Sequence, residues 1–128
     1  MLLSLKDNLP FTSVILCYQD HTLEISNVLV DTGSASTIFA ADVVFNIQIA
    51  PSADDVLHTI QGVGGSEVVF TRRVDYLKLG EQSLKNFEIE VGGMDYGFEI
   101  NGILGMDFLV QAGVVINLHE FSIEFNHR

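Results

Sequence analysis

The feature that most constrains this chain is an apolar run of β-forming residues, Val28–Val30, that leads directly into an acidic residue. The run predicts a buried strand that ends at Asp31, so that the carboxylate is held on a rigid element and is partly shielded from water. Two positions later, Gly33 allows the backbone to turn sharply and to approach a ligand closely. The next three residues, 34–36, are small and leave room beside the acid. The stretch therefore predicts a site built around one carboxylate at the end of a strand.

Alternating apolar and polar residues predict further strands on both sides of this site. Residues 11–18 and 22–30 form the first pair, joined by a turn at residues 19–21. Ser26 and Asn27 interrupt the alternation of the second strand, as a β-bulge does. Residues 37–39 predict a short strand, whereas the pattern of residues 40–47 fits either a helical turn or more strand. Strands are also expected over residues 56–60, 66–73, 74–79 and 87–91, so the fold class that follows is all-β.

The C-terminal quarter contains a second short apolar run that ends at a glycine. Residues 103–105 read Ile-Leu-Gly and predict a buried strand, and residues 106–112 predict one short helix. Gly113 stands where a glycine commonly ends a helix, and Asp107 lies in the first turn, where a negative charge favours the helix dipole. Residues 114–118 and 121–125 predict a final hairpin. Its last strand either closes the sheet within the chain or pairs across a subunit interface.

Composition limits the class of protein and its partners. The 128 residues suit a single domain spanning 1–128, and 48% hydrophobic against 18% charged residues argues against disorder. A net charge of −11 with six Lys and Arg argues against nucleic acid or an anionic membrane as partner. The apolar runs are too short to span a membrane. The lone Cys17 has no disulfide partner within the chain and favours a reducing, cytoplasmic location.

Two other kinds of chemistry find little support in the sequence. The four histidines share no metal-ligand spacing, so we expect no metal and no cofactor. Ser34 and Ser36 lack the strand–turn–helix setting of a serine nucleophile, so a serine hydrolase is not expected.

Taken in order, these parts resemble the retropepsin-like branch of the aspartic proteases, which are single-domain homodimers. The resemblance rests on the hairpin before Asp31, the Asp-Thr-Gly triplet of residues 31–33, and three glycines within residues 62–65. It also rests on the Ile-Leu-Gly strand that runs into a short helix, and on the C-terminal strand. The resemblance implies a closed retropepsin-like β-barrel with one short helix near the C-terminus.

The resemblance also implies a role for each matched residue. Asp31 is the catalytic acid, Thr32 ties together the active-site loops of two subunits, and Gly33 contacts the substrate backbone. The residues expected to bind substrate or support the site are Thr32, Gly33, Ser34, Ala35, Gly62, Val63, Gly64, Gly65, Ile103, Leu104 and Gly105. Of these, residues 62–65 are expected at the tip of a flap and residues 103–105 beneath the catalytic loop. Turn chemistry alone makes residues 62–65 an ordinary glycine hairpin, and only the order of the elements favours a flap.

The chain departs from the viral members of this family at two positions. Viral members often carry an Asp two residues after the loop glycine and an Arg just after the later glycine, and the two form an ion pair. Here these positions are Ala35 and Met106. Since both partners are missing together, no buried charge is left unpaired. The departure indicates a cellular or bacterial type of member.

The sequence thus predicts an aspartic endopeptidase in which two copies of Asp31, one from each subunit of a homodimer, activate a water molecule. The expected partners are a second copy of the chain and a peptide or protein substrate. One alternative is a retropepsin-like domain with weak or no catalysis that serves dimerisation or peptide binding. The other is an unrelated small β-barrel binding module in which the triplet is a coincidence.

Overall fold

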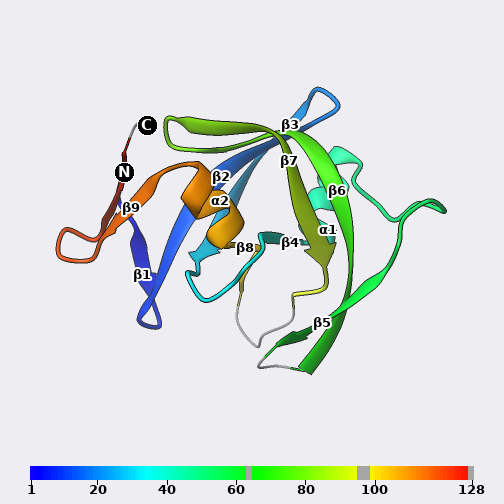
Figure 1. Ribbon diagram of the computed structural model, residues 1–128, viewed down its shortest axis with the longest axis horizontal. Helices are drawn as coiled ribbons and strands as arrows, with labels where there is room; N and C mark the ends of the chain where they lie inside the picture. The colour runs from blue at the N-terminus through cyan, green and yellow to red at the C-terminus, as the bar shows by residue number, and fades with distance from the viewer. Residues whose placement is uncertain (63–64, 95–98, 127–128) are drawn as a thin grey trace.

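The structure is a computed structural model that describes residues 1–62, 65–94 and 99–126, with the backbone alone for residues 60–62 and 65–67. The described part is mostly β-structure, with an eight-stranded sheet and a separate two-stranded sheet. Figure 1 shows these elements along the chain. The strands are β1 (Ser4–Lys6), β2 (Leu9–Tyr18), β3 (His21–Val30), β4 (Ile38–Ala40), β5 (His58–Gly62), β6 (Gly65–Leu79), β7 (Gln82–Gly92), β8 (Gly102–Leu104), β9 (Val114–Asn117) and β10 (Ser122–Phe125).

Helical structure is confined to short segments. The helix expected near the C-terminus is present as α2 (Met106–Gln111), and Gly113 follows it with a φ of +66°, as expected of a glycine that ends a helix. The segment whose pattern was ambiguous is a one-turn helix, α1 (Ala41–Val44), continued by a 3-10 turn, η1 (Phe45–Ile47). In the described part of the chain, no helix has the length and apolar character needed to cross a membrane.

The strand order places a C-terminal strand in the middle of N-terminal ones. The large sheet runs β1-β2-β3-β8-β4-β7-β6-β5, and β2 pairs with β6 as well. β8 lies parallel to β3 on one side and antiparallel to β4 on the other. Because β8 separates β3 from β4, the loop that joins these two strands has to cross its end. This crossing loop contains Asp31.

The predicted bulge in β3 is confirmed by the register of the first hairpin. Thr12 pairs with Val28 but Val14 pairs with Ile25, so two residues of β3 stand opposite one residue of β2. Asn27, inside the bulge, has a φ of +54°. In a regular strand, residues three apart face opposite sides. The bulge lets both Ile25 and Val28 enter the core, where they are 2% and 0% exposed.

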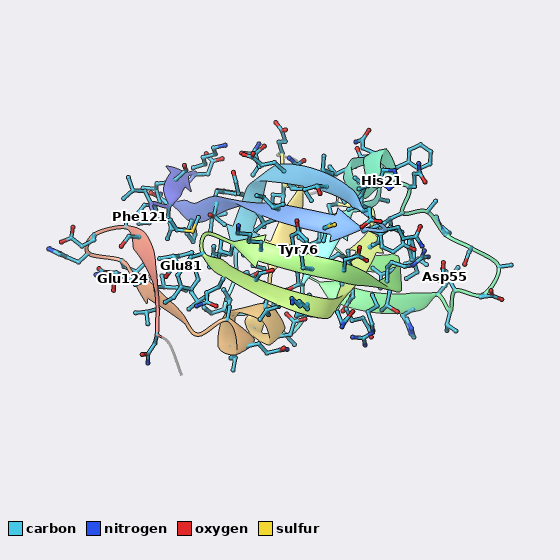
Figure 2. All side chains as sticks on the ribbon, turned by 90° about the horizontal axis from the view of Figure 1, so that it is seen from above. His21, Asp55, Tyr76, Glu81, Phe121 and Glu124 are labelled. Carbon is cyan, nitrogen blue, oxygen red and sulfur yellow. The ribbon has the colours of Figure 1, made fainter. Side chains whose placement is uncertain are left out.

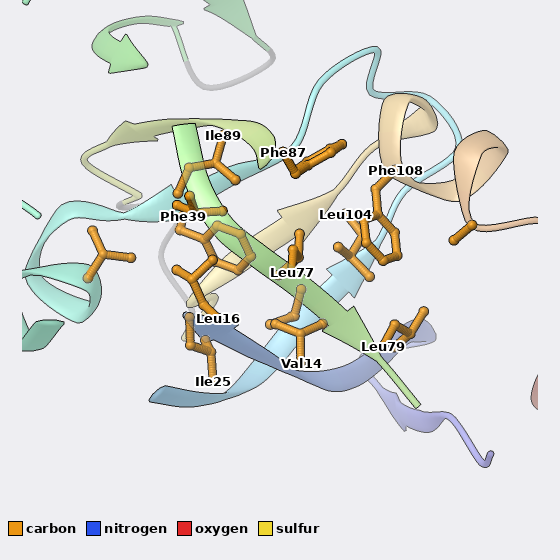
Figure 3. Close-up of a cluster of buried hydrophobic side chains, with 14 of the residues drawn as sticks. Val14, Leu16, Ile25, Phe39, Leu77, Leu79, Phe87, Ile89, Leu104 and Phe108 are labelled. Atoms are coloured by element: carbon orange, nitrogen blue, oxygen red, sulfur yellow. The ribbon is translucent and has the colours of Figure 1, made fainter. Parts of the chain in front are cut away.

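Side chains from both halves of the chain fill one core cluster (Figure 3). Phe39, Leu104 and Phe108 are 0% exposed within it. The ring of Phe108, from α2, meets the ring of Phe87, from β7, edge to face with a centroid distance of 5.6 Å. Such a contact adds about 1 kcal/mol to the burial itself. The core therefore fixes α2 against the sheet beside the crossing loop.

The structure corrects the prediction for residues 66–79. They were expected as two strands, 66–73 and 74–79, but form the single strand β6 of 15 residues. β6 pairs with β7 along most of its length, and Tyr76, Leu77 and Lys78 pair with β2 as well. The continuous ladder leaves no break at residue 74. The short strand β1 was also not predicted.

Of the two arrangements considered for the last strand, the structure shows pairing within the chain. β10 pairs with β9 on one side. On its other side, the amide of Ile123 donates to the carbonyl of Met1 at 2.8 Å, and the amide of Leu3 donates to the carbonyl of Phe121 at 3.0 Å. Both edges of β10 are thus occupied by the chain's own backbone.

The long loop before β5 is fastened to the sheet by Arg72. Its guanidinium donates to Asp55 Oδ2 at 2.6 Å and to the carbonyl of Ala50 at 3.2 Å. The Asp55 carboxylate also accepts the amide of Ser52 at 2.7 Å. This backbone hydrogen bond and the Arg72 charge outweigh partial desolvation and lower the pKa of Asp55 below 3.8. Asp55 lies at the end of the molecule opposite Phe121 (Figure 2).

Candidate active site

Asp31 is held at the end of β3 by the strand that was inserted beside it. Its amide donates to the carbonyl of Leu104, in β8, at 3.0 Å. Its carboxylate Oδ1 accepts the amide of Gly33 at 2.9 Å, and the side chain is half-buried. The carboxylate is therefore oriented by its own loop and remains open to solvent on one side. A molecule bound beside the loop could therefore contact this carboxylate.

The loop after Asp31 is hydrogen-bonded to the start of α2. The carbonyl of Ser34 accepts the amide of Met106 at 2.8 Å, and the carbonyl of Ala35 accepts the amide of Asp107 at 3.2 Å. These two amides belong to the first turn of a helix, where no intrahelical acceptor exists for them. The loop thus supplies hydrogen-bond acceptors for the first turn of α2, and these hydrogen bonds hold the loop in place.

Gly105 allows this contact because any side chain there would collide with the loop backbone. A Cβ at this position would lie 2.2 Å from the carbonyl oxygen of Ser36 and 2.9 Å from that of Ser34. These atoms are backbone and cannot rotate away. The placement of Gly105 beneath the loop agrees with the position expected from the sequence.

A contact between two polar residues, which the sequence did not predict, connects the same three segments. The hydroxyl of Thr37, which is 0% exposed, donates to Asp107 Oδ1 at 2.7 Å and accepts the amide of Gly105 at 3.0 Å. The Thr37 amide donates to Asp107 Oδ2 at 3.3 Å. Asp107 does lie in the first turn of α2, as predicted, but the interpretation as a dipole charge was incomplete. Its two oxygens also bind the start of β4.

No local pattern in the sequence could have shown this pair. Thr37 and Asp107 are 70 positions apart, and their contact follows from β8 lying between β3 and β4. The contact could have been predicted only if residues 37–39 and 103–105 had been expected to form neighbouring strands. A buried Thr37 hydroxyl would then need a hydrogen-bond partner on the adjacent segment.

Beside the Asp31 loop, the structure exposes a surface that is unusually apolar. Thr32 and Gly33 are exposed, and an apolar groove starts at Thr32 and follows α2 and β9. Met106, Val110 and Val115 are exposed by 39%, 52% and 43% along it. The residues that line the groove are Thr32, Met106, Leu109, Val110, Gly113, Val114, Val115, Ile116 and Asn126.

The glycine-rich turn expected as a flap is the tip of the β5–β6 hairpin. Gly62 pairs with Gly65 at the end of the ladder, while Val63 and Gly64 lie outside the described residues. In Figure 1 this hairpin extends away from both chain termini. The hairpin itself is confirmed, and its action as a flap stays a prediction.

The described residues contain no obvious metal site. Within residues 1–62, 65–94 and 99–126, no three His, Cys, Asp or Glu side chains gather as metal ligands. The two positions that carry an ion pair in viral relatives hold Ala35 and Met106, and both are exposed.

A β-fold that holds an Asp-Thr-Gly loop against an inserted strand and a short helix defines a retropepsin-like aspartic protease. The comparison with protein families agrees: the family described as aspartyl protease matches residues 18–108. This chain belongs to the retropepsin-like aspartyl protease family. A comparison with curated proteins gave no match.

Proposed function

We propose that this protein is an aspartic endopeptidase that acts as a homodimer, with one Asp31 from each subunit in each active site. The observation that carries the proposal is the carboxylate of Asp31, which is oriented by the loop and half-exposed. In the described hydrogen-bond network of one chain, no second carboxylate lies beside it. Asp107, the other carboxylate near the loop, is bound to Thr37 and to the amide of Phe108. A second copy of the chain supplies the missing acid.

The chemistry explains why two carboxylates are needed. Two carboxyl groups so close together cannot both be ionised, because their negative charges repel, and the pair therefore shares a proton. The ionised carboxylate takes a proton from a water molecule, which attacks the carbonyl carbon of the peptide bond. The protonated carboxylate gives its proton to the carbonyl oxygen. When the tetrahedral intermediate collapses, the C–N bond breaks and a proton passes to the leaving amine.

The surface around Thr32 supports the proposed dimer. The exposed Thr32 and the apolar groove beside it form a continuous patch next to the catalytic loop. Contiguous exposed apolar surface of this kind is typical of interaction sites. We propose that the patch contacts the second copy. Since both edges of β10 are occupied within the chain, we place this contact on α2, β9 and the Thr32 loop rather than on β10.

Two further features belong to the same proposal. The pairing of β2 with both β3 and β6 supports a closed barrel of the retropepsin type. The β5–β6 hairpin is proposed as the flap that closes over the substrate, with Gly62, Val63, Gly64 and Gly65 at its tip. Closure excludes water and contributes backbone contacts to the peptide.

The test is to mix wild-type chains with the Asp31→Asn variant. Asn is nearly isosteric with Asp, so the variant is expected to fold and dimerise but to hydrolyse no peptide. Refolding the two forms together at fixed total protein should make activity fall as the square of the wild-type fraction. A linear fall would mean that each chain holds a complete site, and the shared-dyad proposal would be wrong.

A peptide-hydrolysis assay with a statine-type inhibitor separates the remaining alternatives. An aspartic endopeptidase is expected to cleave peptides and to be inhibited. Binding of peptides without any turnover by the wild type would instead identify a dimerisation or peptide-binding domain without catalysis.

A further inference from the structure

A row of directly paired side chains crosses five strands of the large sheet on the face opposite the core. The pairings that define it link β3 to β8, β8 to β4, β4 to β7 and β7 to β6. From β3 to β6 the row reads Leu29, Ile103, Ile38, Glu90 and Thr71. Directly paired residues point to the same face of a sheet. The sequence neighbours of this row, such as Leu104 and Phe39, point the other way into the core cluster.

This row begins on the same face as the Asp31 carboxylate. Asp31 directly follows β3, and its amide continues the pairing with β8 by donating to the carbonyl of Leu104. Residues two apart in such an extended segment share a face, which places Asp31 on the side of Leu29. Glu90 is tied to the same site through the backbone, because its amide donates to the carbonyl of Thr37 at 2.9 Å. The row therefore runs from the strand that leads into Asp31, across β8, β4 and β7, to β6.

Glu90 is chemically unlike the rest of this row. Its Oε2 is buried and has no hydrogen-bond partner among the residues that the structure describes. Ile38, which pairs with Glu90 on β4, is 4% exposed. Val69, two residues before the Thr71 that pairs with Glu90 on β6, is 1% exposed. Neither belongs to the core cluster. Glu90, half-buried as a whole, thus has buried apolar neighbours on β4 and β6.

A carboxylate beside such neighbours is costly unless a partner reaches it. An oxygen that is buried without a donor carries a desolvation penalty. The adjacent acid on the same strand face behaves differently: Glu88 pairs with Arg73 at 3.1 Å, and both side chains are more than half exposed. An acid kept without a partner in a binding surface favours a ligand that brings a positive charge.

We propose that Glu90 is a specificity-determining residue, and that it binds a lysine or arginine side chain of the peptide substrate. This inference rests on the proposed endopeptidase function, of which it names the substrate class. A cationic side chain would satisfy the buried oxygen with a charge-assisted hydrogen bond. The net charge of −11 attracts cationic peptides over the whole surface. Glu90 adds the local selection at one position of the substrate.

The test compares peptides that carry lysine, norleucine or glutamate at one position, with that position moved stepwise along the peptide around the cleavage site. At one position, wild type is expected to prefer lysine over norleucine by roughly 30-fold in kcat/KM, the effect of a desolvated charge pair. The Glu90→Gln variant should reduce this ratio to about threefold or less. Glu90→Leu, which matches the apolar neighbours, should reverse the preference. Glu88→Gln makes the same charge change on the same strand face and should leave the ratio as in wild type.

Binding to the Asp31→Asn protein, measured by fluorescence anisotropy, separates this inference from the proposed function. Tighter binding of the lysine peptide without any hydrolysis by wild type would support the role of Glu90 and reject the endopeptidase. Hydrolysis by wild type with equal kcat/KM for lysine and norleucine at every position would reject the role of Glu90 alone. Equal effects of Glu88→Gln and Glu90→Gln would also reject it, because a general loss of negative charge would then explain the change.

Discussion

Gly105→Ala is the substitution for which the structure gives the clearest expectation. The new methyl carbon would lie 2.2 Å from the Ser36 carbonyl oxygen and 2.5 Å from its carbonyl carbon. An ordinary contact needs about 1 Å more, so either the loop or α2 has to move. Overpacking of this kind costs about 1–3 kcal/mol. Movement also strains the two hydrogen bonds from α2 to Ser34 and Ala35, each worth about 1 kcal/mol.

Together these terms predict that Gly105→Ala lowers the free energy of unfolding by about 3–5 kcal/mol, with additivity assumed. For a domain of this size, that corresponds to a fall in Tm of roughly 10 °C or more. Peptide hydrolysis should fall even where the variant is fully folded, because the displaced loop carries Asp31. The assay is thermal unfolding by circular dichroism, together with peptide hydrolysis at a temperature where the variant is fully folded.

Gly93→Ala is the matched control, since a Cβ at Gly93 meets no atom of the described residues within 4 Å. Both substitutions restrict the unfolded chain in the same way, but Gly93→Ala causes no steric clash in the folded protein. Its free energy of unfolding should therefore stay within about 1 kcal/mol of wild type. If Gly105→Ala were as stable as Gly93→Ala, the close contact beneath the catalytic loop would not exist in the protein, and the argument from it would be wrong.

Three further predictions concern single interactions and charge. Thr37→Val removes a buried hydroxyl from Asp107 and from a backbone amide, and should lower the free energy of unfolding by about 2–4 kcal/mol in urea denaturation; Thr37→Ser, which keeps the hydroxyl, should lose less. The pKa of Asp55 is lowered by the Ser52 amide and by Arg72, so its contribution to stability is present above pH 3.8 and is lost as the pH falls through the lower folded value. The difference in Tm between wild type and Asp55→Asn should therefore be constant near neutral pH and shrink in strong acid; a difference that grows in acid would contradict the assigned cause. Because each chain carries a net charge of −11, the proposed dimer should dissociate less at high salt, and sedimentation at two ionic strengths measures this.

The sequence predicted those parts of the fold that depend on neighbouring residues. Alternation located β2 and β3, and the phase break at Ser26 and Asn27 located the bulge that the register confirms. Gly113 located the end of α2. Each of these signals lies within a few residues of the feature it predicts, so that propensity and spacing are sufficient.

What the sequence did not predict depends on contacts between distant residues. β6 was divided at residue 74 because no single turn residue marks whether a long strand continues, and its continuity comes from pairing with both β7 and β2. The Thr37–Asp107 pair and the unpartnered oxygen of Glu90 follow from the position of β8 and β4 between other strands. Without that topology, the sequence identifies Thr37, Asp107 and Glu90 only as polar residues in or next to a strand or a helix.

The same topology explains why this site needs a second chain under the proposed mechanism. The hydrogen bonds from β8 and α2 hold the Asp31 loop from below and from one side, where Leu104 and Ser34 make their contacts. They leave Thr32 and the carboxylate facing outward, beside an apolar groove that water alone would cover. In the proposed dimer, a two-fold partner covers that groove and also brings the second acid. The free energy of burying apolar surface then opposes the repulsion between two strongly acidic chains and between the two carboxylates. Since a shared proton relieves part of that repulsion, the proposed mechanism makes assembly of the dimer and formation of the catalytic pair a single event.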